Sequence, residues 1–255
     1  MSDRFAIYPS LRRKRVLVTG GATGIGASIV EHFAHQGSHV GFLDVDTGSA
    51  EALTARLPPQ ATVRFERADL RDIGELRAGI ARLKVSLGGG IEILVNNAAR
   101  DDRHSIDEVT PEYWDERMAV NLRHQFFCIQ AVKDDMIAAG GGSIINMSSI
   151  SFVRASGGMP VYTAAKSAVI GLTRSVARDL GPHHIRANIV YPGWIMTQRQ
   201  LDLWVTEEAD AKRAAGQCIP DRLYEPDVAR MVLWLAADDS RMVTAREFLV
   251  DGGWF

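Results

Sequence analysis

The sequence predicts an α/β fold with a doubly wound parallel sheet of seven strands. Short apolar, β-branched runs alternate with longer amphipathic stretches along the 255 residues, and no linker, internal repeat or low-complexity tract divides them. Apolar strands separated by helices form parallel sheets that are covered on both faces. Right-handed crossovers then give a Rossmann-type sheet with strand order 3-2-1-4-5-6-7, in a single domain over residues 1–255.

The expected strands are short runs rich in apolar and β-branched residues: Arg15–Thr19, His39–Asp44, Thr62–Glu66, Ile91–Val95, Ser143–Met147, Arg186–Val190 and Glu247–Val250. The expected helices share an amphipathic pattern: Ile25–Gln36, Ser49–Leu57, Ile73–Leu87, Pro111–Ala139, Tyr162–Leu180 and Pro226–Ala237. One irregular segment, residues 197–224, follows a late strand and has its own helical pattern. We expect it to form a small helical substrate lid over the carboxyl edge of the sheet, where open α/β sheets bind ligands.

Composition and charge exclude several classes of function. Hydrophobic residues make up 46% and charged residues 24% of the chain, as in ordinary globular proteins. The formal net charge of −2 gives no electrostatic reason to expect a nucleic acid or a membrane as partner. Cys128 and Cys218 are the two cysteines, which suits a reducing cytoplasm, and the seven histidines lack metal-ligand spacing, so no metal is expected. Residues 1–10 lack the apolar core of a signal peptide, and no apolar run approaches the ~20 residues that span a bilayer.

A glycine-rich turn follows the first expected strand. Gly20, Gly24 and Gly26 lie between the strand Arg15–Thr19 and the first expected helix. Gly20 allows a tight turn, Gly24 lets the backbone approach a pyrophosphate, and Gly26 lets the helix and the strand pack closely. The strand–turn–helix context favours a dinucleotide site over the alternative, which is a turn that is merely rich in glycine.

Acidic residues at the ends of the second and third strands bear on the choice of dinucleotide. Asp44 stands where a carboxylate can accept hydrogen bonds from the adenosine ribose hydroxyls and repel a 2′-phosphate. Thr23 offers no cation to such a phosphate, so NAD is expected rather than NADP. The alternative is that Asp44, or its neighbour Asp46, only caps the next helix. Asp69 has two similar interpretations, as a partner of the adenine amino group or as a helix N-cap.

Polar residues on later segments form a candidate reactive centre. Tyr162 and Lys166 are four apart on an expected helix and therefore share one face. Ser149 lies just past the fifth strand, and Asn121 lies inside the expected helix Pro111–Ala139, where Asn has below-average helical propensity. Each residue alone could be an ordinary packed or surface side chain. Their combination with the glycine-rich turn is hard to explain by chance.

In these motifs the chain resembles the short-chain dehydrogenase/reductase family. The resemblance covers nearly the whole chain and rests on motifs that match in order and spacing: Thr19–Gly26, Asn96–Ala98, Asn121, Ser149, Tyr162, Lys166 and Pro192-Gly193. It implies that Ser149, Tyr162 and Lys166 are a catalytic triad and that Asn121 completes a tetrad by holding a water in a proton relay to Lys166. The expected dinucleotide contacts are Gly20, Thr23, Gly24, Ile25, Gly26, Asp44, Asp69, Leu70, Asn97, Ala98, Tyr162, Lys166, Pro192, Gly193, Ile195 and Thr197.

The chemistry of alcohol oxidation fits these residue types. The hydroxyl proton must leave as the carbonyl forms, but a free Tyr has a pKa near ~10 and is a poor base at neutral pH. We expect the Lys166 ammonium to stabilise the phenolate of Tyr162 and to hold the nicotinamide ribose, while Ser149 hydrogen-bonds the substrate oxygen. The hydride passes to the nicotinamide, and the protein supplies position and electrostatics.

The loops after the fourth, fifth and sixth strands are expected to bind the substrate. They combine charged, amide and hydroxyl groups with an occasional Trp, which suits a small polyol because an indole covers an apolar sugar face. The alternative for the cluster Asp101–His104 is a solvated loop with internal ion pairs. The candidate substrate contacts are Asp102, His104, Ser149, Ser151, Arg154, Tyr162, Trp194, Gln198 and Arg199.

A narrower resemblance is to bacterial aldose 1-dehydrogenases, including those of D-xylose, L-arabinose, L-fucose and L-rhamnose. The residues that carry it are Asp101–His104, Tyr113–Arg117, Asn121–His124, Thr197, Arg199, Gln200, Trp204 and Thr206. It implies NAD-dependent oxidation of the anomeric hydroxyl of a small cyclic sugar to a lactone. A 6-deoxy sugar would place its methyl group against Trp194 or Phe152.

Two other functions stay open on the sequence alone. An oxidoreductase of another substrate, a polyol or a 3-oxoacyl thioester, would keep the same catalytic residues; reductases of the acyl type usually use NADPH, against which Asp44 argues. A non-catalytic nucleotide-binding regulator is the second, and the intact Ser149, Tyr162 and Lys166 argue against it.

Assembly into a homotetramer is expected from the resemblance. In relatives, the helices that correspond to Pro111–Ala139 and Tyr162–Leu180 pair between subunits, and both are rich in apolar residues here. The chain ends in Gly253-Trp254-Phe255, and burial of this tail in an interface or within the subunit would avoid exposing two large rings.

Overall fold

Seven parallel strands form one sheet in the order β3-β2-β1-β4-β5-β6-β7, which confirms the predicted fold class and strand order. The computed structural model describes residues 5–255. Residues 1–4, which belong to the expected domain and to the segment expected to lack a signal peptide, lie outside the described part. The strands are β1 (Arg15–Thr19), β2 (His39–Asp44), β3 (Thr62–Arg67), β4 (Ile93–Asn96), β5 (Gly142–Met147), β6 (Ile185–Pro192) and β7 (Glu247–Val250).

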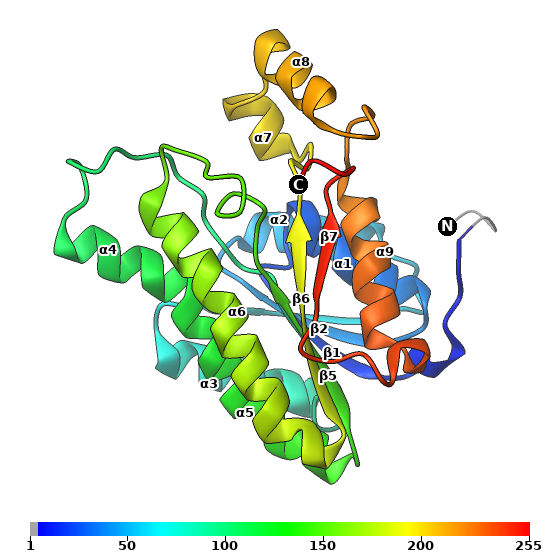
Figure 1. Cartoon of the computed structure of the whole chain (residues 1–255). Helices are drawn as coiled ribbons and strands as arrows, with labels where there is room; N and C mark the ends of the chain where they lie inside the picture. Colours follow the sequence, from blue (N-terminus) through cyan, green and yellow to red (C-terminus); the bar gives the residue numbers. More distant parts are fainter. Residues whose placement is uncertain (1–4) are drawn as a thin grey trace.

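Helices cover both faces of the sheet (Figure 1). One face carries α1 (Gly24–His35), α2 (Thr47–Arg56) and α9 (Glu225–Ala236). The other face carries α3 (Ile73–Ser86), α4 (Pro111–Met118), α5 (His124–Ala138) and α6 (Pro160–Leu180). Short 3₁₀ turns occupy Pro9–Leu11, Gly181–His183 and Asp238–Ser240.

The sheet separates two apolar cores, one under each layer of helices. Val16 and Val18 of β1 face the α1–α9 layer, whereas Leu17 between them faces the α3–α5–α6 layer. All three side chains are fully buried. Burial on both sides explains why the strands read as continuous apolar runs rather than as alternating ones.

The expected helix Pro111–Ala139 is not one regular α-helix. Between α4 and α5 the backbone forms a π turn, η2 (Ala119–Arg123), in which the His124 N–H donates to the carbonyl of Ala119, five residues back. A π turn widens the helix by one residue and is frequent at functional sites. Asn121, with its low helical propensity, lies in the middle of this turn.

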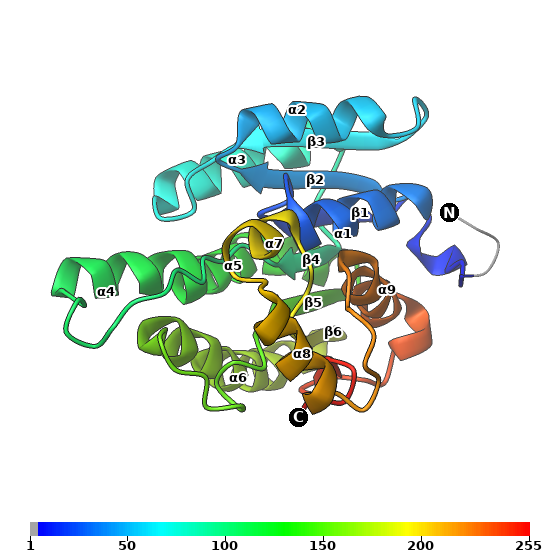
Figure 2. The ribbon, with the colours of Figure 1, turned by 90° about the horizontal axis from the view of Figure 1, so that it is seen from above.

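The irregular segment at 197–224 holds two helices, α7 (Gln198–Leu203) and α8 (Glu207–Gly216). Threonine side chains cap both: Thr197 accepts from the Gln200 N–H, and Thr206 accepts from the Ala209 N–H. Seen from above, the two helices lie across the carboxyl ends of the central strands (Figure 2). Their position matches the expected insertion over the ligand edge of the sheet.

Two general findings concern the described chain, residues 5–255. None of its helices is long and apolar enough to cross a membrane. It also contains no group of three or more His, Cys, Asp or Glu side chains that is arranged to hold a metal ion.

Candidate active site

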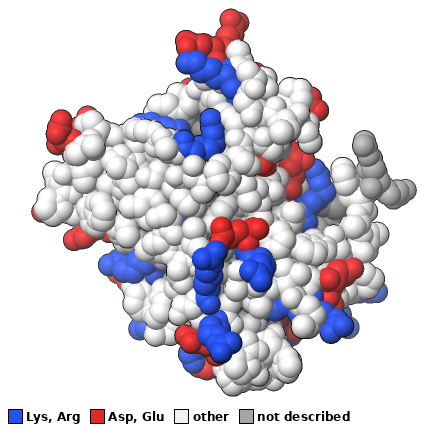
Figure 3. Space-filling model, in the orientation of Figure 1, with Lys and Arg blue, Asp and Glu red and all other residues white. Residues whose placement is uncertain are grey.

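A cavity of about 1130 Å³ runs along the carboxyl edge of the sheet. One end lies at the turn between β1 and α1, and the other lies among the loops after β4, β5 and β6, beneath α7. In Figure 3, basic atoms gather in the hollow below the α7–α8 segment. The size and position suit a dinucleotide with a small second substrate.

The glycine-rich turn at one end has no room for side chains. Gly20 has φ +65°, and a Cβ on it would lie 2.8 Å from the Cα of Ala98. A Cβ on Gly26 would lie 1.8 Å from the carbonyl oxygen of Gly20. Gly24 has φ +53° and faces the cavity, and a Cβ on it would meet only the Thr197 side chain, at an ordinary contact distance of 3.4 Å. The first and third glycines are therefore fixed by packing, and the second leaves backbone open to a ligand.

The N-terminus of α1 begins at this open backbone, and no side chain neutralises the partial positive charge of the helix end. Within the described chain, the N-cap Thr23 makes no side-chain capping bond, and the first turn of α1 contains no acidic residue. The first N–H groups of a helix attract anions, so this end fits a pyrophosphate. The residues present therefore fit a nicotinamide dinucleotide.

Asp44 and Asp46 have different roles. Asp46 is the N-cap of α2, because its carboxylate accepts from the Ser49 N–H at 3.0 Å. Both acids line the cavity, but the Asp44 carboxylate does not cap α2 and accepts from the Ala22 N–H at 2.9 Å and the Val45 N–H at 2.8 Å. The helix-cap alternative therefore holds for Asp46 and is wrong for Asp44.

Asp69 is not the cap of the helix that follows it. Asp72 caps α3 by accepting from the N–H groups of Gly74 and Glu75, so the N-cap alternative for Asp69 is wrong. Asp69 lines the cavity and pairs with the Arg71 guanidinium at 2.6 Å, and hydrogen bonding from Arg71 lowers the pKa of Asp69.

Asn97 holds the glycine-rich turn against β4. Its side-chain N–H groups donate to the carbonyls of Thr19 at 3.1 Å and Gly20 at 2.9 Å. The Thr19 hydroxyl in turn accepts from the N–H groups of Asn97 and Ala98. These bonds tie the end of β1 to the end of β4 at the cavity.

The reactive centre lies in the middle of the cavity, where Ser149, Tyr162 and Lys166 all line the wall. The Lys166 ammonium nitrogen lies 5.7 Å from the centroid of the Tyr162 ring and donates to the Met147 carbonyl at 2.9 Å. Lys166 is almost fully buried, whereas Tyr162 is half-buried. The three side chains come from the end of β5 and from one face of α6, as their spacing predicts.

Burial dominates the protonation of this centre. It lowers the pKa of Lys166 to about 7, which the nearby Asp101 charge partly opposes. Burial also raises the pKa of Tyr162, and the Asp101 charge adds to this, while the Ser149 hydrogen bond and the Arg103 charge lower it. Both shifts favour uncharged side chains. The protein itself therefore holds Tyr162 as a neutral phenol, which differs from the lowered pKa that we expected from Lys166.

Asn121 is fully buried in the π turn beside the cavity. Its side-chain amide donates to the carbonyls of Arg100 and Arg117 and accepts from the Arg100 N–H at 2.9 Å. Its own carbonyl accepts from the Gln125 side chain at 3.3 Å. The side chain of Asn121 thus fastens the loop after β4 to the α4–α5 region.

The structure brings most of the expected substrate contacts to the other end of the cavity: Ser149, Ser151, Arg154, Tyr162, Trp194, Gln198 and Arg199. The buried Ser151 hydroxyl has no hydrogen-bond partner within residues 5–255. All expected dinucleotide contacts also line the cavity.

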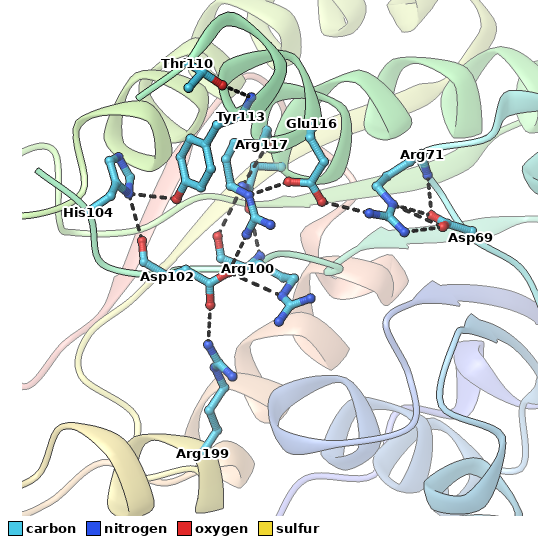
Figure 4. Close-up of polar contacts among 11 residues, drawn as sticks. Asp69, Arg71, Arg100, Asp102, His104, Thr110, Tyr113, Glu116, Arg117 and Arg199 are labelled. Atoms are coloured by element: carbon cyan, nitrogen blue, oxygen red, sulfur yellow. Dashed lines mark hydrogen bonds and ion pairs between the residues drawn. The ribbon is translucent and has the colours of Figure 1, made fainter. Parts of the chain in front are cut away.

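Asp102 and His104 differ from this expectation, because neither is among the described residues that line the cavity. His104 is buried, and its ring nitrogens contact the Tyr113 hydroxyl at 2.9 Å and the Val161 N–H at 3.2 Å. Asp102 is enclosed by arginines, as Figure 4 shows. The ion pairs of Asp102 agree with the alternative interpretation of Asp101–His104 as an ion-paired loop. His104 fits neither interpretation, because it is buried and hydrogen-bonded and makes no ion pair within residues 5–255.

Several residues line the cavity that the sequence did not single out as ligand contacts, among them Asp101, Arg103 and Trp254. Asp101 and Arg103 belong to the loop after β4, from which Asp102 and His104 were expected to bind the substrate. Trp254 comes from the chain end, and the Arg154 guanidinium lies over its ring at 3.4 Å. Phe152, an expected partner of a sugar methyl group, packs on Tyr191 instead, with ring centroids 5.6 Å apart.

The fold and the site define a nicotinamide-dependent oxidoreductase, and comparisons with known proteins agree. A family described as enoyl-(acyl carrier protein) reductase matches residues 20–255. The chain is 46% identical to "Probable galactose dehydrogenase GalD" of Rhizobium meliloti over 97% of both chains. It is 44% identical to the D-xylose 1-dehydrogenase of Caulobacter vibrioides over 98% of both chains. The chain belongs to the short-chain dehydrogenase/reductase family, and it is an enzyme.

Solved structures show the same fold. A short-chain type dehydrogenase/reductase from Mycobacterium ulcerans superimposes with a TM-score of 0.89 at 25% identity, covering 96% of this chain and 90% of that one. A blue fluorescent protein from a metagenomic library, in complex with NADPH, superimposes with a TM-score of 0.86 at 36% identity, covering 96% and 99%. The alternative of a non-catalytic regulator finds no support among these relatives.

Proposed function

We propose that the protein oxidises the anomeric hydroxyl of a small aldose to the lactone, with NAD as hydride acceptor and Tyr162 as the proton acceptor. The observation that carries the proposal is the single cavity in which Ser149, Tyr162 and Lys166 separate a dinucleotide end from a polar end. The names of the two curated relatives, a galactose dehydrogenase and a D-xylose 1-dehydrogenase, support a sugar as the substrate.

Two hydrogens leave the sugar in this reaction. The nicotinamide, when bound, supplies the site that accepts the C1 hydrogen as hydride. The phenolate form of Tyr162 accepts the hydroxyl proton and becomes the neutral phenol, and the Ser149 hydroxyl donates a hydrogen bond to the same sugar oxygen and orients it. C1 becomes the carbonyl carbon of the lactone, and the ring oxygen stays bonded to it.

Lys166 assists the proton transfer at Tyr162 without contacting the sugar. One of its N–H groups is committed to the Met147 carbonyl, which leaves the others for the nicotinamide ribose and for a water that Asn121 would hold in a proton relay. Since burial raises the pKa of Tyr162, the base form becomes more abundant as the pH rises. We therefore expect the oxidation rate at saturating substrates to increase between pH 7 and pH 10, as measured by NADH formation.

NAD is the dinucleotide that we propose. Asp44 places a carboxylate at the end of β2, where an adenosine 2′-phosphate would meet a negative charge. Thr23, just before Gly24, supplies no positive charge to offset it. A relative at 36% identity is known in complex with NADPH, so the fold does not exclude a 2′-phosphate and the proposed preference for NAD rests on these residues.

Assembly as a homotetramer is also proposed. An apolar groove between the α4–α5 region and α6 supports it, and it is lined by Met118, Leu122, Arg123, Phe126, Phe127, Ala168 and Leu172. Phe126 is 47% exposed in the single chain. Light scattering at micromolar concentration should give four times the chain mass; a single-chain mass would contradict the assembly. Cys128 and Cys218 are both free, which fits a reducing compartment such as the cytoplasm.

The experiment that tests the function is a screen of NADH and NADPH formation with aldopentoses, aldohexoses and 6-deoxy sugars. The proposal predicts turnover with at least one aldose, a lactone as the first product, and a higher kcat/KM with NAD than with NADP. Polyols and a 3-oxoacyl thioester, the latter assayed with NADPH in the reducing direction, belong in the same screen. Turnover confined to those substrates would replace the proposal with the other oxidoreductase function.

A further inference from the structure

A set of polar contacts joins α7 to the loop after β4 across the sugar end of the cavity. We call it the clasp, and its members are Asp101, Asp102, Arg103, Arg199, Gln200 and Trp204. The Arg199 guanidinium contacts Asp102 at 2.6 Å, and the Gln200 side chain donates to Asp101 at 2.9 Å. The Arg103 guanidinium lies over the Trp204 ring at 5.1 Å.

Asp102 is the centre of the clasp, because both of its carboxylate oxygens are occupied (Figure 4). One oxygen pairs with Arg199 on α7. The other pairs with Arg117 on α4 at 2.5 Å and lies 3.5 Å from Arg100. With three arginines around it and a position outside the cavity wall, Asp102 has no carboxylate oxygen directed at a sugar.

The α4 side of the clasp is held firmly. The Arg117 side chain is 10% exposed, and its guanidinium also pairs with Glu116. Glu116 pairs in turn with Arg71 at 2.9 Å, and Arg71 pairs with Asp69 at the adenosine end of the cavity. Charge-paired side chains thus extend from the adenosine end to Asp102, and they fix the carboxylate that faces α7.

The α7 side depends on fewer contacts. The Arg199 side chain is 45% exposed, in contrast to Arg117. None of the α7 residues Gln198–Leu203 is buried within the described chain, so apolar packing does little to hold this helix. Gln200, the residue after Arg199, links two parts of the site. Its side chain accepts from the Trp194 indole N–H at 2.9 Å and donates to Asp101. The position of α7 therefore also sets the position of the Trp194 ring in the cavity wall.

We propose that Asp102 is a positioning residue for sugar oxidation: it holds α7 over the sugar end of the cavity through Arg199, instead of binding the sugar itself. The inference rests on the proposed function, because it assigns a role within that same site. Loss of the Asp102–Arg199 pair leaves the reactive centre intact and loosens the wall that contains Gln198 and Trp194. The sugar then binds more weakly, while the chemical step at Tyr162 is largely preserved once the sugar is bound.

Kinetics of Asp102→Asn, Arg199→Gln and the double variant test this role. Each single variant should raise KM for the sugar about two- to five-fold, the range of partly exposed ion pairs, with kcat changed less than about two-fold. The double variant should be no worse than the more affected single variant, because both changes remove the same contact. Asp107→Asn, an acid of the same loop that is exposed and outside the clasp, is the matched control and should leave KM unchanged.

Multiplied effects in the double variant would overturn the proposal, because they would show two independent sugar contacts. Unchanged KM in both single variants would overturn it as well. Arg199→Gln keeps the test decisive if Asp102→Asn fails to fold, since Arg199 lies on the exposed side of the pair. Rising salt should also increase KM of the unmodified enzyme more than that of Arg199→Gln, since partly exposed pairs are screened.

Hydrogen–deuterium exchange separates this inference from the proposed function. The amides of α7 should exchange about two- to five-fold faster in Asp102→Asn and Arg199→Gln than in the unmodified protein. In the double variant they should exchange no faster than in the more affected single variant. Unchanged exchange would contradict the clasp, whatever the enzyme oxidises. Conversely, faster exchange together with no turnover of any aldose would retain the clasp and reject the proposed sugar oxidation.

Discussion

The two ends of the cavity are built by different means. At the dinucleotide end, backbone atoms make the surface: Gly20, Gly24 and Gly26 bring strand and helix together, and Asn97 ties the turn to β4. At the sugar end, side chains from the loops after β4, β5 and β6 and from the last residues make the surface, and charge pairs centred on Asp102 hold it.

This difference separates what is general in the enzyme from what is particular. A backbone cradle recognises a pyrophosphate, which every dinucleotide has, and tolerates few changes. A surface made of side chains on loops can change with the substrate while the sheet stays the same. Variants at the two ends should therefore fail in different ways.

A Cβ at Gly26 should have the largest effect, because it would lie 1.8 Å from the Gly20 carbonyl and 2.6 Å from the Asn97 side chain. Gly26→Ala should abolish measurable dinucleotide binding and lower Tm by about 10 °C or more. Gly48→Ala is the control, since its Cβ would meet only Asp46 at 3.8 Å. Titration with NADH fluorescence and a thermal melt measure both. Normal binding in Gly26→Ala would show that the turn is not the dinucleotide site.

Lys166→Met should affect function and stability in opposite directions. Removing the ammonium should lower kcat about 100-fold or more, because the proton transfer at Tyr162 loses its support. Burial of Lys166 disfavours its charged form in the folded protein, so Met should raise Tm at pH 7 by about 2 to 5 °C.

The pH dependence of that stability gain follows from the pKa of Lys166, which is about 7 in the folded protein against 10.5 for the free side chain. Between these values the unfolded chain binds more protons than the folded one, so the stability of the unmodified protein rises with pH. The Tm advantage of Lys166→Met should shrink from pH 7 to pH 10. An advantage that grew with pH would mean that the folded protein favours the charged ammonium.

Asp44→Ala should have a smaller effect, on the choice of dinucleotide. The ratio of kcat/KM for NAD to that for NADP should fall about ten-fold, because the carboxylate that repels a 2′-phosphate is gone. Asp46→Ala is the comparison: it removes the cap of α2 and should lower Tm while leaving the ratio unchanged. An unchanged ratio in Asp44→Ala would assign the preference to another residue.

The sequence predicted the sheet, and it predicted which residues gather at the glycine-rich end of the cavity, because both depend on local patterns. Apolar runs and amphipathic spacing identify the strands and helices, and the glycines, Asp44 and Asn97 directly follow predicted strands. Tyr162 and Lys166 were predictable for the same reason, since four-residue spacing on a helix puts two side chains on one face.

The sugar end was harder to predict, because its geometry depends on contacts between distant residues. Whether Asp102 faces a ligand or an arginine depends on Arg199, 97 positions away, and Trp254 reaches the cavity only because the chain end folds back under Arg154. The π turn at Asn121 also escaped prediction, since amphipathic spacing does not distinguish one extra residue in a long helix.

Turnover and dinucleotide binding in Tyr162→Phe test most directly whether the Tyr162 side chain, between the two ends of the cavity, is the proton acceptor. We expect kcat for the best aldose to fall by about 10³-fold, with the Kd for NAD within about two-fold of the unmodified value and Tm unchanged or raised. Near-normal turnover would place the proton acceptor elsewhere and contradict the account; equal loss of NAD binding would show that Tyr162 belongs to the dinucleotide end alone.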